Sequence, residues 1–290
     1  MHYEEPLFRP PCEARSLIIQ VTIGCPHNRC AFCGMYKWKK YRVRETEEVK
    51  ADLRKARLAY RYVGSIFLAD GNTIAMNSEK LADIISYARD LFPEAERISS
   101  YGGARFLKGK PPEALRRLRE AGLDIIYFGL ESGDDEILAK MQKGVDSQGM
   151  IEAARRVKEA GIDLSVYILL GLGGEELWRQ HAENTARVLN AMQPDFIRPR
   201  TLAILPGIPL FDEVKEGRFQ EASGETIMRE LQILLSSLEI EDAWFLSDHI
   251  SNYVPIYGHL PEEREKMLAM VEMALDNPRE YLGPRHLTHL

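Results

Sequence analysis

Three of the four cysteines in this 290-residue chain lie within one short segment, at Cys25, Cys30 and Cys33. The segment directly follows the apolar run 17–23, a pattern that predicts a strand leading into a loop. Three thiolates can hold three irons of a cubic [4Fe–4S] cluster and leave the fourth iron open to another ligand. The spacing therefore indicates an iron–sulfur centre with an open coordination position.

The same thiols fit two simpler roles. A structural zinc usually has four ligands, and His27, inside the loop, is the one nearby candidate for the fourth. A disulfide with one spare thiol is the other role, although no signal peptide opens the chain and its length is ample for a core without cross-links. We assign no role to His27, Asn28 or Arg29.

The C-x4-C-x2-C spacing, with Phe32 before the last cysteine, resembles the signature loop of the radical S-adenosylmethionine (radical SAM) superfamily. The commoner spacing there is C-x3-C-x2-C, so the first gap of this chain holds one extra residue. The resemblance extends over residues 15–205. It implies that Cys25, Cys30 and Cys33 hold a [4Fe–4S] cluster, and that S-adenosylmethionine (SAM) binds its open iron. Reductive cleavage of SAM would then give a 5′-deoxyadenosyl radical that abstracts hydrogen from a substrate.

The elements that must position this loop alternate along residues 15–205. Strand-like and helix-like stretches follow one another, which predicts an α/β fold with a parallel sheet. Two amphipathic faces are expected to be core, one at Leu81, Ile84, Ile85, Ala88 and Leu91, the other at Ala182, Ala186, Leu189 and Met192. The predicted strands are Leu17–Thr22, Ser65–Ala69, Arg97–Tyr101, Ile125–Leu130, Leu164–Leu170 and Phe196–Ile204.

A short internal repeat supports this alternation. The segment 119–124 recurs as 158–163, and its glycines, Gly122 and Gly161, each end a helix and lead into a strand. Six such units match the partial (βα)6 TIM-like barrel of the radical SAM type, in which chemistry gathers at the carboxyl ends of the strands. We therefore expect an N-terminal extension (1–14), a partial barrel (15–205) and a mostly helical C-terminal cap (206–290).

The resemblance also implies which residues hold the cofactor. Asp70-Gly71-Asn72 follows the second strand, where the family places a turn that reaches the methionine amino group, although an ordinary Asp-Gly turn gives the same pattern. Glu131 ends the fourth strand, where a polar residue commonly binds the ribose; a capping carboxylate is the alternative. Lys143 could meet a carboxylate or remain solvated. The implied contacts are Phe32, Met35, Tyr36, Gly71, Asn72, Glu131, Lys143, Ile168 and Gly171.

Other residues could face a substrate. Arg198 and Arg200 alternate along the sixth strand, so both side chains point the same way and could hold a carboxylate or phosphate. Structural ion pairing is the alternative. Catalytic or hydrogen-bonding candidates are Tyr101, Tyr167, His249, Asn252 and Tyr253. The basic segment 37–44 fits a solvated loop or a contact with an anionic partner.

The composition narrows the choice of partners. Net charge is −6, which argues against nucleic-acid binding by bulk electrostatics, and no apolar run could span a bilayer. No cysteine follows Cys33, which argues against a second cluster. We expect a cytoplasmic, oxygen-sensitive enzyme with a small-molecule substrate and an external electron donor such as flavodoxin or ferredoxin. The alternatives are an iron–sulfur electron-transfer or cluster-carrier protein, and a radical SAM enzyme that modifies RNA, protein or a porphyrin.

Overall fold

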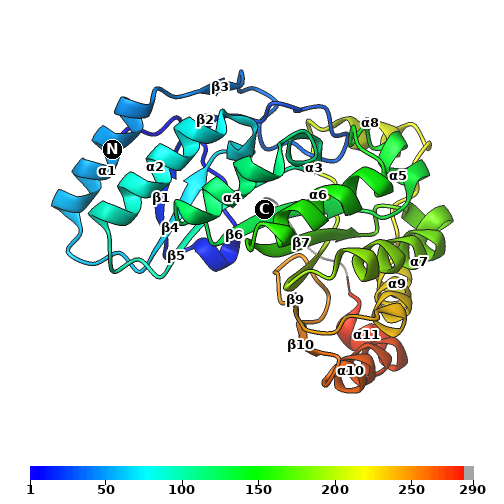
Figure 1. Cartoon of the computed structure of the whole chain (residues 1–290). Coiled ribbons are helices and arrows are strands. Elements are labelled where there is room, and N and C mark those ends of the chain that lie inside the picture. The colour runs from blue at the N-terminus through cyan, green and yellow to red at the C-terminus, as the bar shows by residue number, and fades with distance from the viewer. Residues whose placement is uncertain (284–290) are drawn as a thin grey trace. The chain divides into compact units, whose positions relative to one another are not determined.

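The structure is a computed structural model that describes residues 1–283 (Figure 1). The chain forms two compact units, and each is described by itself. Unit 1 comprises residues 1–28, 35–128 and 152–164, whereas unit 2 comprises residues 29–34 and 129–151 and the residues from 165 onward. The final residues of the expected C-terminal cap, 284–290, lie outside the described part of the chain.

Unit 1 begins with the short helix η1 (Pro11–Glu13) and strands β1 (Leu17–Gln20), β2 (Thr22–Ile23) and β3 (Arg42–Val43). It continues with α1 (Thr46–Ala59), β4 (Ser65–Ala69), η2 (Thr73–Ala75), α2 (Ser78–Leu91), β5 (Arg97–Tyr101), α3 (Ala104–Leu107) and α4 (Pro112–Glu120). Three elements run from one unit into the other: β6 (Ile125–Glu131), α6 (Ser147–Glu159) and β7 (Asp163–Leu170).

Unit 2 contains α5 (Asp135–Lys140), α7 (Gly174–Met192), β8 (Phe196–Thr201), α8 (Pro209–Lys215) and α9 (Gly224–Ser237). It ends with β9 (Ala243–Ser247), β10 (Ile256–Leu260), α10 (Arg264–Asp276) and α11 (Pro278–Tyr281). The region after residue 205 is thus largely helical among the described residues, but it also contributes two strands.

The strands follow the order β1-β4-β5-β6-β7-β8-β9-β10. Five of the pairings, β1–β4, β4–β5, β5–β6, β7–β8 and β8–β9, are parallel, and β9–β10 is antiparallel. Sequential parallel strands separated by helices are the topology of a partial TIM-like barrel, which confirms the predicted fold class. All six predicted strands form, although the first divides into β1 and β2 and the sixth ends at Thr201.

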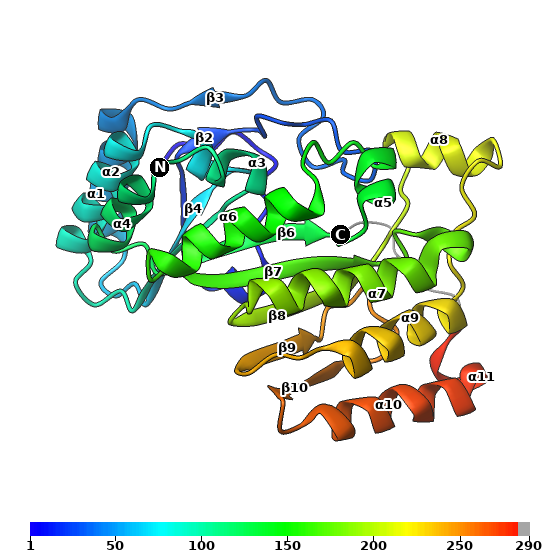
Figure 2. The ribbon, with the colours of Figure 1, turned by 45° about the vertical axis from the view of Figure 1, so that its right-hand side comes forward.

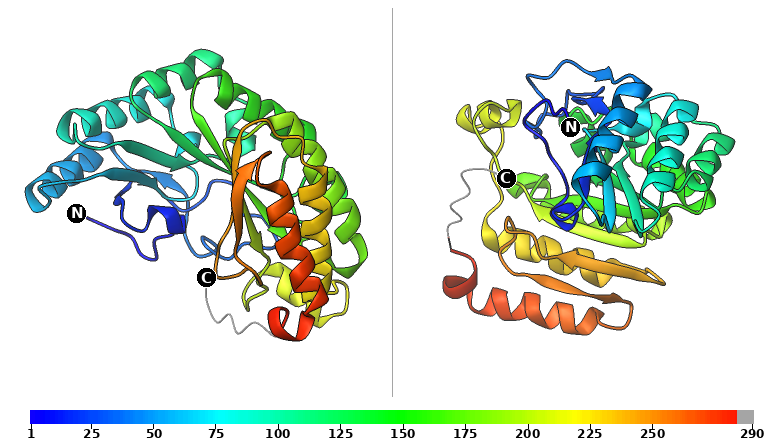
Figure 3. Two further views of the ribbon diagram at one scale, coloured as in Figure 1. Left: turned by 90° about the horizontal axis from the view of Figure 1, so that it is seen from below. Right: turned by 90° about the vertical axis from the view of Figure 1, so that its left-hand side faces the viewer.

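Helices line up along the strands within each unit. In unit 1, α1, α2 and α4 lie on one side of the strands, as the two views of Figure 3 show. In unit 2, α7, α9 and α10 lie side by side (Figure 2). The predicted apolar faces are buried: Leu81, Ile84, Ile85 and Ala88 on α2, with Leu91 half-buried, and Ala182, Ala186, Leu189 and Met192 on α7. The core therefore forms as the periodicity predicts.

The repeated glycines end their helices as expected. Gly122 and Gly161 have φ of +110° and +73°, in the left-handed region. The residue after each donates its backbone N–H to a carbonyl five residues earlier, from Leu123 to Leu118 and from Ile162 to Val157. This is the helix-ending pattern in which glycine is favoured.

No helix within residues 1–283 combines the length and the apolar character needed to cross a bilayer.

Candidate cofactor site

In unit 1, the turn after β4 holds the start of the cysteine loop. Asp70 is fully buried, and its Oδ2 accepts hydrogen bonds from the Gly24 N–H (3.0 Å), Gln20 Nε2 (3.0 Å) and Lys39 Nζ (3.3 Å). Burial raises the pKa of Asp70, and these donors offset only part of that rise. Because Gly24 immediately precedes Cys25, Asp70 fixes the backbone at the first cysteine.

Gly71 lies directly against the cysteine loop. A Cβ at this position would come within 2.6 Å of Tyr36 Cε2 and 3.2 Å of the Cys25 Cβ, so only glycine fits. The Tyr36 ring is buried and packs edge-on against Phe8, with ring centroids 5.4 Å apart. The structure thus brings together three predicted site residues, Cys25, Tyr36 and Gly71.

The same turn presents buried acceptors. Within residues 1–283, neither Asp70 Oδ1 nor Asn72 Oδ1 has a hydrogen-bond partner, although Asp70 is fully buried and Asn72 is only 4% exposed. Leaving such groups unpaired costs free energy, so buried acceptors usually have donors. An ammonium group, as in the methionine part of SAM, would supply them. These residues therefore fit the cofactor that the sequence implies.

The cysteine loop contains a left-handed residue in its longer first gap. Asn28 has φ of +44°, and its Nδ2 donates to the Tyr36 carbonyl at 2.6 Å. That carbonyl also accepts from the Lys39 N–H at 3.0 Å. Asparagine tolerates this conformation better than most residues. The Tyr36 carbonyl is already engaged in the loop, and Met35, beside it, is half-buried.

The basic segment 37–44 is less solvated than expected. Lys39 is buried and pairs with Asp70, and Arg44 is buried and pairs with Asp52 at 2.9 Å. Two of its cations therefore anchor the loop internally, which corrects the interpretation of the segment as a solvated loop. Trp38 is 65% exposed.

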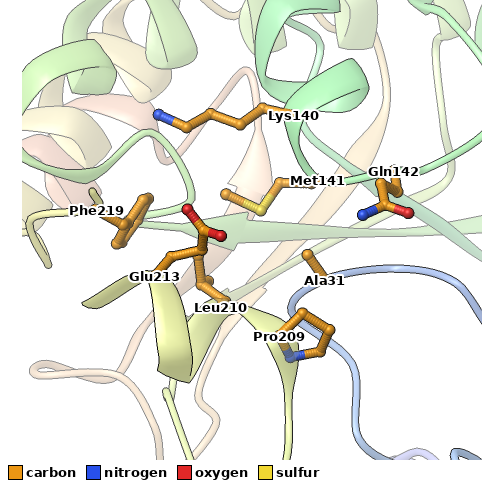
Figure 4. A pocket seen from close by; sticks show the side chains of 8 residues that line it. All are labelled: Ala31, Lys140, Met141, Gln142, Pro209, Leu210, Glu213 and Phe219. Carbon is orange, nitrogen blue, oxygen red and sulfur yellow. The ribbon is translucent and has the colours of Figure 1, made fainter. Parts of the chain in front are cut away.

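In unit 2, the remaining cysteines flank an anchored residue. The Ala31 N–H donates to the Met141 carbonyl (3.0 Å), and the Ala31 carbonyl accepts from the Leu210 N–H (3.1 Å). The Cys33 N–H donates to the Cys30 carbonyl at 3.3 Å. A small pocket opens over Ala31; Figure 4 shows Lys140, Glu213 and Phe219 among its lining side chains. The N–H and the carbonyl of Ala31 therefore both anchor the loop between Cys30 and Cys33.

Lys143 lies close to two other predicted cofactor contacts of unit 2, Glu131 and Phe32. Its Nζ lies 3.2 Å from Glu131 Oε1 and 5.7 Å from the centre of the Phe32 ring. Burial lowers the pKa of Lys143, but the charges of Glu131, Cys30 and Cys33 raise it above its ordinary value. Lys143 is thus a largely buried cation paired with Glu131 rather than a solvated side chain.

His181 and Glu230, which were not predicted from the sequence, contact the backbone of Glu131 and Gly171. His181 and Glu230 are each about 1% exposed, and His181 Nδ1 lies 2.8 Å from Glu230 Oε1. Although burial lowers the pKa of His181, Glu230 raises it above its ordinary value. Glu230 lies in the buried stripe of α9 and His181 in that of α7. A charged residue within an apolar helical stripe was the signal available in the sequence.

Gly171 and Ile168, two of the expected cofactor contacts, also have structural roles in unit 2. The Gly171 N–H donates to Glu230 Oε2 at 3.0 Å, and φ is +83°, so this backbone conformation accounts for the glycine. Ile168 pairs with Pro199, and its buried side chain shares a face with Val166 and Leu170. Only the backbone of Ile168 is therefore available to a ligand on the opposite face.

That opposite face carries the two arginines. Arg198 Nε donates to Ser165 Oγ at 2.9 Å, and the Arg200 guanidinium lies 4.5 Å from the centre of the Tyr167 ring. Both arginines are half-buried, and neither pairs with a carboxylate within residues 1–283. Burial and the Arg200 charge lower the pKa of His249 to about 4, so this imidazole is neutral. Its Nδ1 accepts from the Ser251 N–H at 3.1 Å, which leaves Nε2 as the protonated nitrogen.

The three remaining predicted candidates, Asn252, Tyr253 and Tyr101, each contact other parts of their own unit. Asn252 is structural, because its side chain bonds Thr201 and the Pro199 carbonyl. The Tyr253 ring lies against Gly224 at the start of α9. In unit 1, Tyr101 packs edge-on against Phe67, with centroids 5.1 Å apart.

The family model described as the Radical SAM superfamily matches residues 19–186, more than half of the chain. The chain therefore belongs to the radical SAM superfamily, a superfamily of enzymes that use a [4Fe–4S] cluster and SAM. These are accordingly its cofactors, as the cysteine loop predicts.

Among curated relatives, the chain is 25% identical over 245 residues to 4′-phospho-dehydrooxetanocin synthase of Priestia megaterium, covering 78% of this chain and 33% of that protein. It is 29% identical over 209 residues to anaerobic magnesium-protoporphyrin IX monomethyl ester cyclase of Cereibacter sphaeroides, covering 71% of this chain and 33% of that protein. The match thus spans about a third of each of these relatives.

A solved structure shows the same fold. The Escherichia coli coproporphyrinogen III oxidase HemN, a radical SAM enzyme, superposes with a TM-score of 0.56 at 17% identity, covering 77% of this chain and 53% of that one.

Proposed function

We propose that this protein is a radical SAM enzyme in which Cys25, Cys30 and Cys33 hold a single [4Fe–4S] cluster. When bound, the cluster and SAM supply a 5′-deoxyadenosyl radical that abstracts hydrogen from the substrate. The observation that carries the proposal is the Asp70-Gly71-Asn72 turn, which combines unpaired buried acceptors with close contact to the cysteine loop.

We assign the remaining cofactor roles to side chains with matching chemistry. Asn72 Oδ1 would accept from the methionine ammonium group. Lys143 would attract the methionine carboxylate, and Glu131 would accept from the ribose hydroxyls. Phe32 would shield the cluster or lie against the adenine.

The substrate is an anion held by Arg198 and Arg200. Their lack of carboxylate partners among the described residues supports this assignment, because half-buried guanidinium groups usually find an anion. The neutral imidazole of His249, close enough to Arg200 for its pKa to respond, would donate a hydrogen bond through Nε2. The P. megaterium relative is named for a phosphorylated product, which is consistent with an anionic ligand.

Anaerobic reconstitution tests the proposal. The wild type should bind about four irons per chain and release 5′-deoxyadenosine when dithionite and SAM are added. Cys25→Ala, Cys30→Ala and Cys33→Ala should each abolish the product. Cys12→Ser is the matched control and should retain it. A cluster that forms without yielding 5′-deoxyadenosine would support an electron-transfer or cluster-carrier protein instead.

A tetrapyrrole is a second candidate for the anionic substrate. The face that carries the arginines also bears Phe196, Trp244 and Tyr257, and the latter two are 46% and 56% exposed. Flat aromatic surface beside two guanidinium groups suits a planar polycarboxylate. Two of the proteins similar to this chain are named for porphyrin chemistry. An absorbance shift of added coproporphyrin, lost in Trp244→Ala, would support this substrate, whereas an unchanged spectrum would exclude it.

The cellular context is also a proposal. We infer a cytoplasmic enzyme that receives electrons from a flavodoxin or ferredoxin. Reduction of the cluster by either donor in place of dithionite tests this inference.

A further inference from the structure

A buried pair connects two helices of unit 2 to two strand ends. His181 on α7 and Glu230 on α9 form the pair, with Nδ1 and Oε1 2.8 Å apart. Each residue uses its second polar atom on a backbone group. His181 Nε2 lies 3.3 Å from the Glu131 carbonyl oxygen at the end of β6, and Glu230 Oε2 accepts from the Gly171 N–H after β7 at 3.0 Å.

These contacts define the protonation of the pair. A carbonyl oxygen only accepts, so Nε2 of His181 must carry a proton. Nδ1 lies 2.8 Å from Glu230 Oε1, so a proton is shared between these two atoms. The two side chains thus form a buried hydrogen-bonded pair, and the remaining polar atom of each meets a backbone group.

The need to fill space in the core does not explain why His181 and Glu230 occupy these buried positions. Apolar residues of similar volume usually stabilise a core as well as a buried ion pair does. Apolar residues cannot, however, hold a carbonyl and an N–H at two neighbouring strand ends. Both ends are in the left-handed region, with φ of +65° at Glu131 and +83° at Gly171. For Glu131 this conformation costs about 1–2 kcal/mol, so it must be held by its surroundings.

The backbone conformation at Glu131 also determines where its carboxylate points. The Glu131 carboxylate meets Lys143 at 3.2 Å, beside the Gly129 position, where an added Cβ would overlap Oε1. A change in the backbone at Glu131 would therefore move this carboxylate away from Lys143.

We propose that His181 and Glu230 are positioning residues of the cofactor site, which fix the backbone at Glu131 and Gly171 for SAM binding. This inference rests on the proposed function, because the role of Glu131 toward SAM belongs to it. The pair would act through hydrogen bonds rather than through its net charges.

Substitutions distinguish an effect of the hydrogen bonds from an effect of the net charges. In Glu230→Gln, the amide can donate to Nδ1 of a neutral His181 and still accept from the Gly171 N–H, so every hydrogen bond is retained. Glu230→Ala and His181→Leu remove them. Glu94→Ala breaks the half-buried Arg57–Glu94 pair of unit 1, which has no role in the cofactor site, and is the matched control for general destabilisation.

Two measurements on the reconstituted protein test the inference. The first is the Kd for SAM, read beside iron per chain and melting temperature. We expect Glu230→Ala and His181→Leu to raise the Kd at least tenfold while keeping the iron, with Glu230→Gln within threefold of wild type. The second is amide hydrogen exchange at Gly171 without SAM, which should accelerate in Glu230→Ala and not in Glu230→Gln.

Other outcomes would overturn the inference. It fails if Glu230→Ala lowers the melting temperature as Glu94→Ala does but leaves the Kd unchanged. It also fails if Glu230→Gln is as impaired as Glu230→Ala. If the wild type itself binds no SAM, the proposed function fails, and the exchange at Gly171 still decides whether the pair holds that strand end.

Discussion

Gly71 and Tyr36 are in such close contact that a methyl group added at Gly71 would lie 2.6 Å from ring atom Cε2 of Tyr36. The buried ring cannot move freely, and the Cβ of Cys25 lies on the same side at 3.2 Å. The turn after β4 thus borders directly on Cys25, the first of the proposed cluster ligands.

Gly71→Ala should therefore impair the cofactor site. Overpacking of this kind costs about 1–3 kcal/mol, so we expect iron content or SAM affinity to fall by about tenfold. Iron analysis and SAM titration measure this. Gly64→Ala is the control, since the atoms nearest to its added Cβ belong to the exposed side chain of Tyr62, the first at 3.3 Å. Unchanged iron and affinity in Gly71→Ala would refute the role of this contact.

Asn72→Ala should weaken SAM binding without removing the cluster. A hydrogen bond to a charged group contributes about 1.5–3 kcal/mol, which corresponds to a Kd raised about tenfold or more. Equilibrium binding under anaerobic conditions measures the effect. Asn77→Ala, which removes the N-cap of α2, should cost about 1 kcal/mol of stability and leave the Kd as in wild type. The same Kd in both variants would show that Asn72 does not contact SAM.

Lys143→Met should also reduce SAM affinity. The substitution leaves Glu131 without its cation and removes the positive charge beside Cys30 and Cys33. A hydrogen bond between charged groups contributes about 1.5–3 kcal/mol, so we expect 5′-deoxyadenosine formation to fall about tenfold or more. Lys140→Met, on the neighbouring surface pocket, should retain most of it. Equal loss in both variants would argue against a specific role for Lys143.

The pH dependence of stability should reveal His249. Its pKa is lowered to about 4 from an ordinary value of 6.5. Between these values the unfolded chain binds the proton and the folded chain does not, so stability falls as pH decreases from 6.5 toward 4. His249→Gln should lose less stability than wild type over this range in urea unfolding at pH 7 and pH 5. His2→Gln, at an exposed position, is the control, and parallel losses in all three proteins would contradict the burial of His249.

The structural features that the sequence could predict depend on patterns among residues close together in the chain. Strand lengths, the apolar faces of α2 and α7 and the glycine-ended helices follow from alternation, period and backbone sterics. The cysteine spacing likewise concerns neighbours in the chain. Such patterns identify which elements form and which loop carries the thiols.

What could not be predicted depends on pairs distant in sequence. Asp70 with Gly24, and His181 with Glu230, are separated by 46 and 49 residues. Nothing local distinguishes Lys39 from the exposed cations beside it, because its burial arises from Asp70 and from the carbonyls of Glu4 and Pro6. Likewise, the orientation of Ile168 away from the arginine-bearing face follows from strand register, which the sequence left open.

The most direct test of the central claim is the low-temperature electron paramagnetic resonance spectrum of the dithionite-reduced, reconstituted protein with and without SAM. An open iron predicts a shift in g-values on SAM addition in the wild type and in Cys12→Ser, and no [4Fe–4S] signal in Cys25→Ala. A reduced-cluster spectrum that SAM leaves unchanged would contradict the account, because it would show a cluster with no coordination position for the cofactor.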